Sequence, residues 1–542
     1  MGGGRPGRVG RAWPRAFIVF FLICAAWVFA SPYDGAPDEV RHLIRAAGVI
    51  EGQIFAKPAT EPGLGNVGAY QSVPRGLVRG KAPTSRYNYC YHWLPARSAA
   101  CAPVPGRGGN APTTVITGAG RYNPVYYAAV GEPLVLWPDW TGILLARLIS
   151  AALCAAFLAS AWLSCLEWRR SRLLIAGLLV AATPAFFELA GAVNPNSLEI
   201  AAGISLVAAA IPLLLDRDAA DAQGWLRRAA VAAIAIGQFR SMGPELIAGL
   251  LLVLLLPTPR AHLRQLWERR SARWWSAGVL ASCVLGVAWT ITSGVGDIGN
   301  IAHSKYPTGL ILRTEFQFNG RLLRVVEQMI DGFSYYDTRP PHLILVAWAI
   351  AICFLLATAF AWGTALGRWR LAALITGTLA IPVLFEVAAA NTFGLSFQGR
   401  YILPLAVGTP MLAAFIIGSS GRMTTIRQAR VIRAMIVLLL PFQLLSLGHV
   451  MDRWQSGVGP GHTINPLLGS WHPVTGSALP LVLMTAGLIG LGLLAWRAAS
   501  SAEEKQAPAS LPTSSRRRPP EREQHGVEGD ERILEGPLGR ID

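Results

Sequence analysis

The sequence predicts an all-α integral membrane protein, and three observations carry that prediction. Of the 542 residues, 52% are hydrophobic and only 15% are charged, whereas soluble domains carry roughly 25% charged residues. The mean hydropathy is +0.40. About twelve apolar runs lie along the chain, several of them close to the length that spans a bilayer. These properties exclude a soluble globular enzyme and a fibrous or disordered protein.

The apolar runs give the expected order of transmembrane helices. The first run, 16–30, follows a basic N-terminal segment at 1–15. The others are 141–166, 173–191, 198–215, 229–238, 244–257, 274–292, 342–361, 371–390, 401–418, 434–449 and 477–496. The blocks of spans, 141–292 and 342–497, leave two large segments outside, 31–140 and 293–341. A Pro-, Ser-, Glu- and Arg-rich tail at 498–542 is expected to be disordered and cytoplasmic.

Basic residues set the expected orientation. The excess of 48 Lys+Arg over 31 Asp+Glu is +17, yet only four of the basic residues are Lys, and most Arg flank apolar runs. This pattern marks cytoplasmic loops and not nucleic-acid binding. The clusters lie at Arg169–Arg172, Arg217–Arg228, Arg260–Arg273, Arg368–Arg370 and Arg422–Arg433. We expect a multi-pass membrane protein with both ends cytoplasmic, and the sequence Val28-Phe29-Ala30 leaves cleavage after the first helix open.

One pair of runs needs a choice between two topologies. A single helix over 229–257 would place the basic stretch Arg260–Arg273 outside. Two short helices that turn at Arg240–Pro244 keep that stretch inside. We predict the two short helices, because broken helices are tolerated where they border a cavity.

An acidic motif, Pro37-Asp38-Glu39-Val40-Arg41-His42, follows the first helix. It opens an amphipathic stretch with Val40, Leu43, Ile44 and Ala47 on one face and Asp38, His42 and Arg45 on the other. We predict a helix that lies in the membrane interface. The polar face has two interpretations: acidic residues at a helix N-terminus with a solvated stripe, or the side chains of a reaction site.

Several other polar residues lie at the outer ends of predicted spans. Ionisable groups in a membrane span cost free energy and therefore indicate a function by default. Four residues fall under this rule: Arg147, Glu188, Arg240 and Glu386. In the segment Asn194–Glu199, Asn196 is expected to cap a helix, with Glu199 three residues later.

The segment Gln398-Gly399-Arg400-Tyr401 precedes a span and allows two roles for its arginine. A guanidinium group at the outer surface can bind a lipid phosphate through two hydrogen bonds. The alternative is an interfacial anchor, with Arg400 reaching to the headgroups and Tyr401 in the aromatic belt. In the second outer segment, Asp337 is the residue whose chemistry extends beyond anchoring.

Two of the seven cysteines are expected to pair. Cys90 and Cys101 lie in the polar first outer segment, where an oxidising compartment favours a disulfide. The other five lie in apolar runs and read as packing residues. No Walker loop, Gly-rich dinucleotide motif, metalloprotease His pair or Gly-x-Ser-x-Gly motif occurs in the sequence.

The order of these motifs resembles a known family. A short first helix, Asp38-Glu39 and a large outer loop before many spans resemble the GT-C superfamily of membrane glycosyltransferases. Within it, the chain is similar to the bacterial membrane family called domain-of-unknown-function family 2142. The matching motifs include Pro37-Asp38-Glu39-x-x-His42, Asn194–Glu199, Tyr335-Tyr336-Asp337-Thr338-x-Pro340 and Gln398-Gly399-Arg400-Tyr401-x-Leu403-Pro404.

The resemblance implies a bacterial plasma-membrane protein with a GT-C-like fold of about twelve transmembrane helices. It also implies a sugar donor linked to a polyprenyl phosphate. The acceptor would be an envelope polysaccharide, lipid or protein, and the use of a divalent metal ion stays open. On this basis Asp38, Glu39 and His42 are the catalytic candidates, with Asp38 preferred as base. The candidates for substrate binding are Glu188, Asn194, Arg240, Asp337, Gln398, Arg400 and Tyr401. A transporter or flippase of lipid-linked glycans and a non-catalytic envelope scaffold remain alternative functions.

Overall fold

A computed structural model describes residues 11–61, 65–78, 90–216, 222–256, 258–297, 305–338, 340–459 and 463–504. Most of the tail that the sequence predicts to be disordered, from residue 505 on, lies outside the described residues, as do the first ten residues. The beginning of that tail is helical, because the last helix extends to Glu504.

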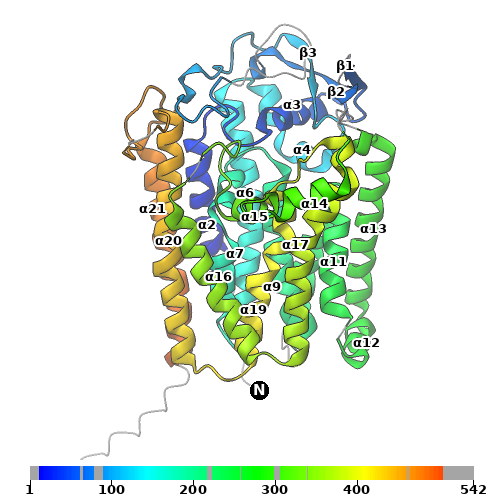
Figure 1. Cartoon of the computed structure of the whole chain (residues 1–542), viewed down its shortest axis with the longest axis vertical. Helices are drawn as coiled ribbons and strands as arrows, with labels where there is room; N and C mark the ends of the chain where they lie inside the picture. The colour runs from blue at the N-terminus through cyan, green and yellow to red at the C-terminus, as the bar shows by residue number, and fades with distance from the viewer. Residues whose placement is uncertain are drawn as a thin grey trace, which may run out of the picture.

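The polytopic helical architecture predicted from the sequence is confirmed. Within the described residues, nine helical segments are long and apolar enough to cross a membrane. They are α2 (Ala12–Ala30), α6 (Trp140–Glu167), α9 (Pro195–Leu215), α13 (Arg270–Ser293), α16 (His342–Trp362), α17 (Ala365–Phe393), α18 with α19 (Gly399–Ala406 and Gly408–Ser419), α20 (Thr425–Gln455) and α21 (Ala478–Glu504). They pack side by side as a bundle (Figure 1).

The three remaining apolar runs are also helical, but each is short, interrupted or less apolar. The run 173–191 forms α7 (Leu174–Ala181) and α8 (Pro184–Ala190), because Thr183 caps α8 and Pro184 begins it. The helices α10 (Ala222–Phe239) and α11 (Gly243–Leu255) are separated by a turn, as the sequence predicts. The count of twelve transmembrane helices therefore stays a prediction.

The segment between α2 and α6 folds into a cap at one end of the bundle, and α12 (Arg260–Glu268) lies at the opposite end (Figure 1). The cap contains α3 (Glu39–Ile50), α4 (Pro124–Val130), α5 (Glu132–Leu136) and two short 3-10 turns, Arg75–Leu77 and Ala99–Cys101. It also contains the strands β1 (Pro58–Glu61), β2 (Gly65–Pro74) and β3 (Pro112–Thr117). These form an antiparallel sheet in the order β1-β2-β3, with Tyr70 opposite Ile116. This small sheet was not predicted from the sequence, and the rest of the fold is helical as expected.

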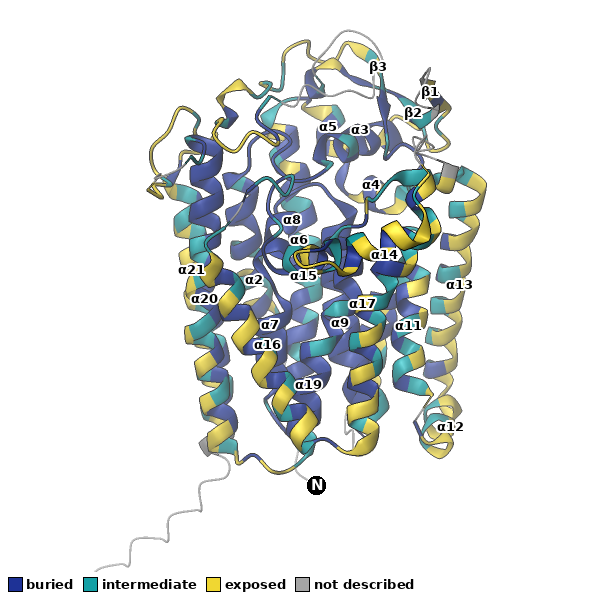
Figure 2. Cartoon of the chain, in the orientation of Figure 1, coloured by how far each residue is buried: buried dark blue, intermediate teal, exposed yellow. Residues whose placement is uncertain are grey.

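The prediction that α3 lies in the membrane interface is wrong. Ten of its twelve residues are buried, including the whole apolar face and the polar residues His42 and Arg45 of the other face. The sheet strands β2 and β3 and the helices α4 and α5 pack around it, so that α3 is enclosed within the cap (Figure 2). Its amphipathic pattern therefore marks a helix inside protein, where the polar side chains have protein partners.

The second large segment, between α13 and α16, contains a 3-10 turn (Val295–Asp297), α14 (Thr308–Phe316) and α15 (Arg321–Asp331). In Figure 1, α14 and α15 run across the bundle and not along it. A tight loop follows α15 and is closed by a bridge between Phe333 and Thr338. We call residues 333–338 the inner loop.

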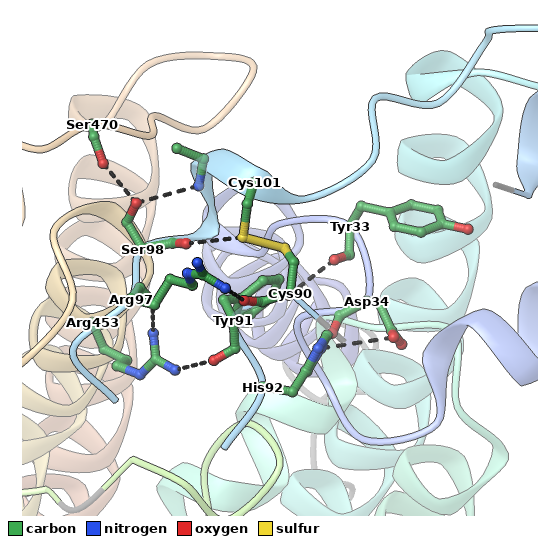
Figure 3. Close-up of a disulfide and its surroundings, with 11 residues drawn as sticks. Tyr33, Asp34, Cys90, Tyr91, His92, Arg97, Ser98, Cys101, Arg453 and Ser470 are labelled. Carbon is green, nitrogen blue, oxygen red and sulfur yellow. Dashed lines mark hydrogen bonds and ion pairs between the residues drawn. A yellow bond between two sulfur atoms is a disulfide. The ribbon is translucent and has the colours of Figure 1, made fainter. Parts of the chain in front are cut away.

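A disulfide joins Cys90 to Cys101 in the cap, with Cα atoms 5.9 Å apart, which is the pair expected from the sequence. Next to it, Arg453 of α20 donates hydrogen bonds to the carbonyl oxygens of Arg97 and Tyr91 (Figure 3). The fully buried Arg453 therefore attaches the disulfide loop to the transmembrane bundle.

Candidate functional site

The site is built around Asp38, the residue immediately before α3. Its backbone is left-handed (φ 65°), which turns its side chain away from the helix axis. The Asp38 Oδ2 atom accepts a hydrogen bond of 2.5 Å from Arg400 Nη2, and Oδ1 lies 3.4 Å from Arg41 Nη1. The side chain is 29% exposed, so part of the carboxylate faces open space.

The electrostatic surroundings keep Asp38 ionised. Burial by itself raises the pKa of this carboxyl group, but the guanidinium groups of Arg400 and Arg41 more than offset that effect. The pKa of Asp38 is held well below its ordinary value, so the side chain is a carboxylate at neutral pH.

Positive charge is in excess at this place. Arg400 is only 3% exposed, donates to the Pro37 carbonyl oxygen (3.2 Å) and lies 5.1 Å from the centre of the Tyr401 ring. Arg240, in the turn after α10, lies over the same ring at 4.6 Å and donates to Asn196 Oδ1. Arg400 and Arg41 therefore contact the Asp38 carboxylate, and Arg240 shares the Tyr401 ring with Arg400. Guanidinium groups gathered in this way can attract an anion. The burial of Arg400 removes the alternative of an anchor in the headgroups.

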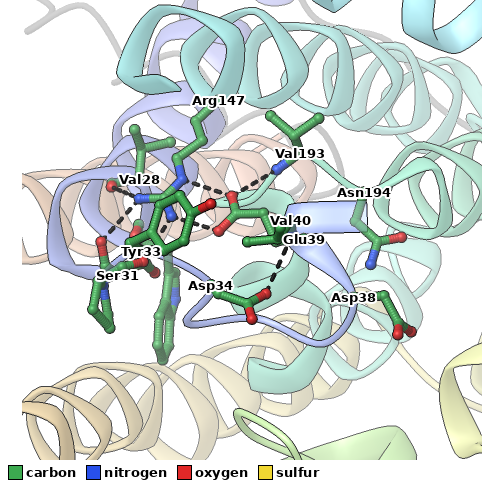
Figure 4. A network of polar contacts seen from close by, with 12 residues as sticks. Val28, Ser31, Tyr33, Asp34, Asp38, Glu39, Val40, Arg147, Val193 and Asn194 are labelled. Carbon is green, nitrogen blue, oxygen red and sulfur yellow. Dashed lines mark hydrogen bonds and ion pairs between the residues drawn. The ribbon is translucent and has the colours of Figure 1, made fainter. Parts of the chain in front are cut away.

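Glu39, the neighbouring acidic residue, has different surroundings (Figure 4). It is 0% exposed, and its oxygens accept hydrogen bonds from Arg147 Nε (2.7 Å), Arg147 Nη2 (2.5 Å) and the Val193 backbone amide (3.1 Å). Arg147 also donates to the carbonyl oxygens of Ser31 and Pro32 at the end of α2. The geometry gives Glu39 a structural role and does not fit the expectation that it acts as base or metal ligand.

Asn194 and His42 also have structural contacts. Asn194, and not Asn196 as predicted, caps α9: its side chain accepts from the Asn196 amide and donates to Pro37 O. His42 Nδ1 is bonded to the Tyr127 hydroxyl at 2.8 Å, and among the described residues its ring forms no hydrogen bond with the Asp38 carboxylate. Burial lowers the pKa of His42 to about 3, so the ring is neutral at pH 7. Both residues support the beginning of α3.

The inner loop contacts the same region from the other side. The Ser334 amide donates to Glu188 Oε1 (2.6 Å), and the Tyr336 hydroxyl donates to Gln398 Oε1 (3.1 Å). Asp337 accepts from Arg453 Nη2 (3.0 Å) and from the Trp93 amide (2.8 Å), and its side chain is 2% exposed. The predicted binding residue Asp337 is therefore a buried link between the inner loop, the cap and α20.

Asp34 is a residue of this region that the sequence reasoning missed. It accepts hydrogen bonds from the Tyr335 hydroxyl (2.8 Å) and the Val40 amide (3.2 Å). Tyr335 in turn accepts from the Asp38 backbone amide (3.2 Å). Burial raises the pKa of Asp34 to about 8, opposite to the shift at Asp38. The only sequence signal was an acidic residue in a short turn between two helices, which is ordinary in proteins.

The structure thus brings Asp38, Arg400, Tyr401 and Arg240 into one cluster, with Gln398 two residues from Arg400. Four other candidate residues make structural contacts around this cluster: Glu39, Asn194, Glu188 and Asp337. Within the described residues, no group of three or more His, Cys, Asp or Glu side chains has the arrangement of a metal site.

Fold and site together define a class: a polytopic helical membrane protein with a cluster of arginines and a partly exposed carboxylate beneath a folded cap. The chain belongs to the family described as "Predicted membrane protein (DUF2142)", whose model matches residues 21–409. No curated protein matches the chain in sequence.

Two solved structures resemble the chain in fold, both of ArnT from Cupriavidus metallidurans. The structure bound to undecaprenyl phosphate shares 16% identity and a TM-score of 0.40, covering 93% of this chain and 79% of that one. The apo structure shares 16% identity and a TM-score of 0.38, covering 88% and 75%.

Proposed function

We propose that this protein transfers a sugar from a polyprenyl-phosphate donor to a cell-envelope acceptor at the cap end of the bundle, on the extracytoplasmic side of a bacterial plasma membrane. The observation that carries the proposal is the contact between Arg400 and the partly exposed Asp38, with Arg240 over the adjoining Tyr401 ring. This contact joins the guanidinium group that we assign to the donor phosphate to the carboxylate that we assign as base. The resemblance of the motifs to the GT-C superfamily supports the same reaction class.

The donor phosphate would be held by the arginines. A guanidinium group offers two parallel N–H donors that match two phosphate oxygens, and it stays charged at every relevant pH. We assign these donors to Arg400 and Arg41, which contact Asp38, and to Arg240, which lies over the adjoining Tyr401 ring. Undecaprenyl phosphate, the ligand named for one ArnT structure, is a lipid of the class proposed.

The proposed step moves one proton and one bond. An acceptor hydroxyl oxygen forms a bond to the anomeric carbon while the bond between that carbon and the phosphate oxygen breaks. The phosphate leaves with the electron pair and is stabilised by the arginines, and the hydroxyl proton passes to an Asp38 oxygen. Base catalysis of this kind contributes typically 10²–10⁴-fold in rate.

Arg400 also links donor binding to the strength of the base. Without ligand, its pairing keeps the pKa of Asp38 low and makes the carboxylate a weak base. A phosphate that binds Arg400 competes with Asp38 for the guanidinium group and brings a second negative charge nearby. Both effects raise the pKa of Asp38 towards its ordinary value, so that the base becomes stronger when the donor is present.

The test is sugar transfer by the purified protein in proteoliposomes that contain radiolabelled polyprenyl-phosphate pentoses and hexoses. Asp38→Asn keeps the side-chain shape and removes the base, so we expect a loss of 10²–10⁴-fold in transfer. The matched control is Glu51→Gln, an exposed acid at the other end of α3, which should retain wild-type transfer. Asp38→Asn activity within about threefold of wild type would contradict the role of Asp38, and movement of intact donor across the bilayer without transfer would favour a flippase.

A further inference from the structure

A second pocket lies on the other side of the inner loop, between α15 and the start of α16. Its volume is about 420 Å³. The polar side chains that line it include Arg324, Glu327, Gln328, Asp331, Tyr336 and His342. A cavity of this size accommodates a small organic ligand.

Asp331, at the end of α15, is the distinctive residue of this pocket. It is only 7% exposed, and its carboxylate has no hydrogen bond or ion pair among the residues that the structure describes. Burial, with a smaller contribution from Glu327, raises the pKa of Asp331 to about 7. The Asp331 carboxyl group borders the pocket and has no protein partner among the described residues, so a ligand that donates hydrogen bonds would supply one.

The pocket adjoins the Asp38–Arg400 cluster through two contacts. Gln328, in the pocket wall, accepts a hydrogen bond of 2.9 Å from the Gly399 amide. A side chain at Gly399 would place its Cβ 2.4 Å from the Val325 carbonyl oxygen, so only glycine allows α18 to approach α15 this closely. Tyr336 lines the pocket and donates to Gln398, two residues before Arg400.

The Asp38–Arg400 cluster and the pocket beside α15 carry opposite charge. Arg400 and Arg41 contact the single carboxylate of Asp38 in the first, whereas Asp331 and Glu327 outnumber Arg324 among the described residues that line the second. An anionic ligand is therefore favoured in the first and disfavoured in the second. Two carboxyl groups, an amide and an imidazole are hydrogen-bonding groups that suit a ligand rich in hydroxyls, and an aromatic ring such as that of Tyr336 suits the face of a sugar.

We propose that this pocket is a subsite for an uncharged, hydroxyl-rich carbohydrate, with Asp331 as its principal hydrogen-bond acceptor. That the carbohydrate is the acceptor of a transfer reaction rests on the proposed function, whereas the binding itself does not. The closing experiment therefore measures binding without donor.

The experiment uses the full-length protein in lipid nanodiscs, free of glycoside detergent, and saturation-transfer-difference NMR. The probes are the methyl glycosides of glucose, mannose, galactose and arabinose, with methyl glucuronide as the anionic control. We expect at least one neutral glycoside to give a signal that Asp331→Ala reduces at least fivefold, and that the glucuronide does not reproduce. Asp331→Asn, which keeps the hydrogen-bonding shape, should retain most of the signal and shows that the site still folds.

The matched control variant is Glu268→Gln, an exposed acid on α12 at the opposite end of the bundle. Its signal should equal that of the wild type. The proposal is overturned if no neutral glycoside binds, if Asp331→Ala binds as the wild type does, or if the glucuronide binds equally well. Glycoside binding that depends on Asp331, found together with an inactive wild type in the transfer assay, would contradict the proposed function and leave the subsite standing.

Discussion

Asp38 and Glu39 are adjacent acids in the same motif, yet they occupy opposite kinds of environment. Glu39 is fully buried, and Arg147 and the Val193 amide occupy both of its oxygens. Asp38 is 29% exposed and pairs with Arg400 and Arg41 at its open edge. The reason is geometric: Glu39 is the first helical residue of α3, whereas Asp38 precedes it with a left-handed backbone. The comparison teaches that the first carboxylate is available to a ligand and the second holds the fold.

The largest effect should come from removing the ion pair between Arg147 and the fully buried Glu39. Arg147→Met leaves Glu39 as a buried carboxylate without its cation, which typically costs about 3–5 kcal/mol of stability. We expect a large fall in thermal midpoint and in the yield of monodisperse protein, measured by scanning fluorimetry and gel filtration. Arg430→Met, at an exposed position near the start of α20, is the control. An unchanged midpoint for Arg147→Met would end the claim that this pair is structural.

A substitution in the ion pair between Asp38 and Arg400 should change ligand binding and not folding stability. Arg400→Lys keeps the positive charge and loses the planar pair of N–H donors, so the donor KM should rise roughly tenfold, about 1.4 kcal/mol. The thermal midpoint should stay close to that of the wild type, and Arg430→Lys should change neither quantity. A loss of stability equal to that of Arg147→Met, with an unchanged KM, would show that the Asp38–Arg400 pair is structural, as the Glu39–Arg147 pair is.

A smaller effect, in the pH dependence of folding stability, should distinguish Asp38 from Asp34, which lies four residues earlier. The pKa of Asp34 is raised to about 8 by burial, so between its unfolded pKa near 4 and pH 8 the folded state binds more protons than the unfolded state. Stability from this group is therefore greatest at low pH and decreases as pH rises from about 4 to 8. Asp38 has the opposite shift, and its contribution is present above pH 4 and is lost only in strong acid.

The measurement is the thermal midpoint of wild type and Asp34→Asn at several pH values between 4 and 8. The substitution keeps an oxygen that can accept from Tyr335 and removes the titration, so we expect a flatter pH profile. Parallel profiles for the two proteins would show that Asp34 does not titrate in this range.

Local patterns predicted several elements correctly, and the physical reason is that their signals are local. The turn between α10 and α11 lies within the predicted Arg240–Pro244, which was chosen because it keeps the basic stretch Arg260–Arg273 inside. The helix at α3 was predicted from its periodicity, but its burial was not, because an apolar stripe has the same pattern against lipid as against protein. The strand β2 was missed because glycines and polar residues interrupt its alternation.

The sequence by itself determined the membrane class, the positions of the apolar helices and the candidate residues, because hydrophobic length and short motifs are contained within a few turns of chain. Only the tertiary structure decided which charge each candidate meets. Glu39 and Arg147 are 108 residues apart, and Asp38 and Arg400 are 362 apart. Nothing in a one-dimensional pattern distinguishes these two pairings, because each depends on which helix ends the folded bundle brings beneath the cap.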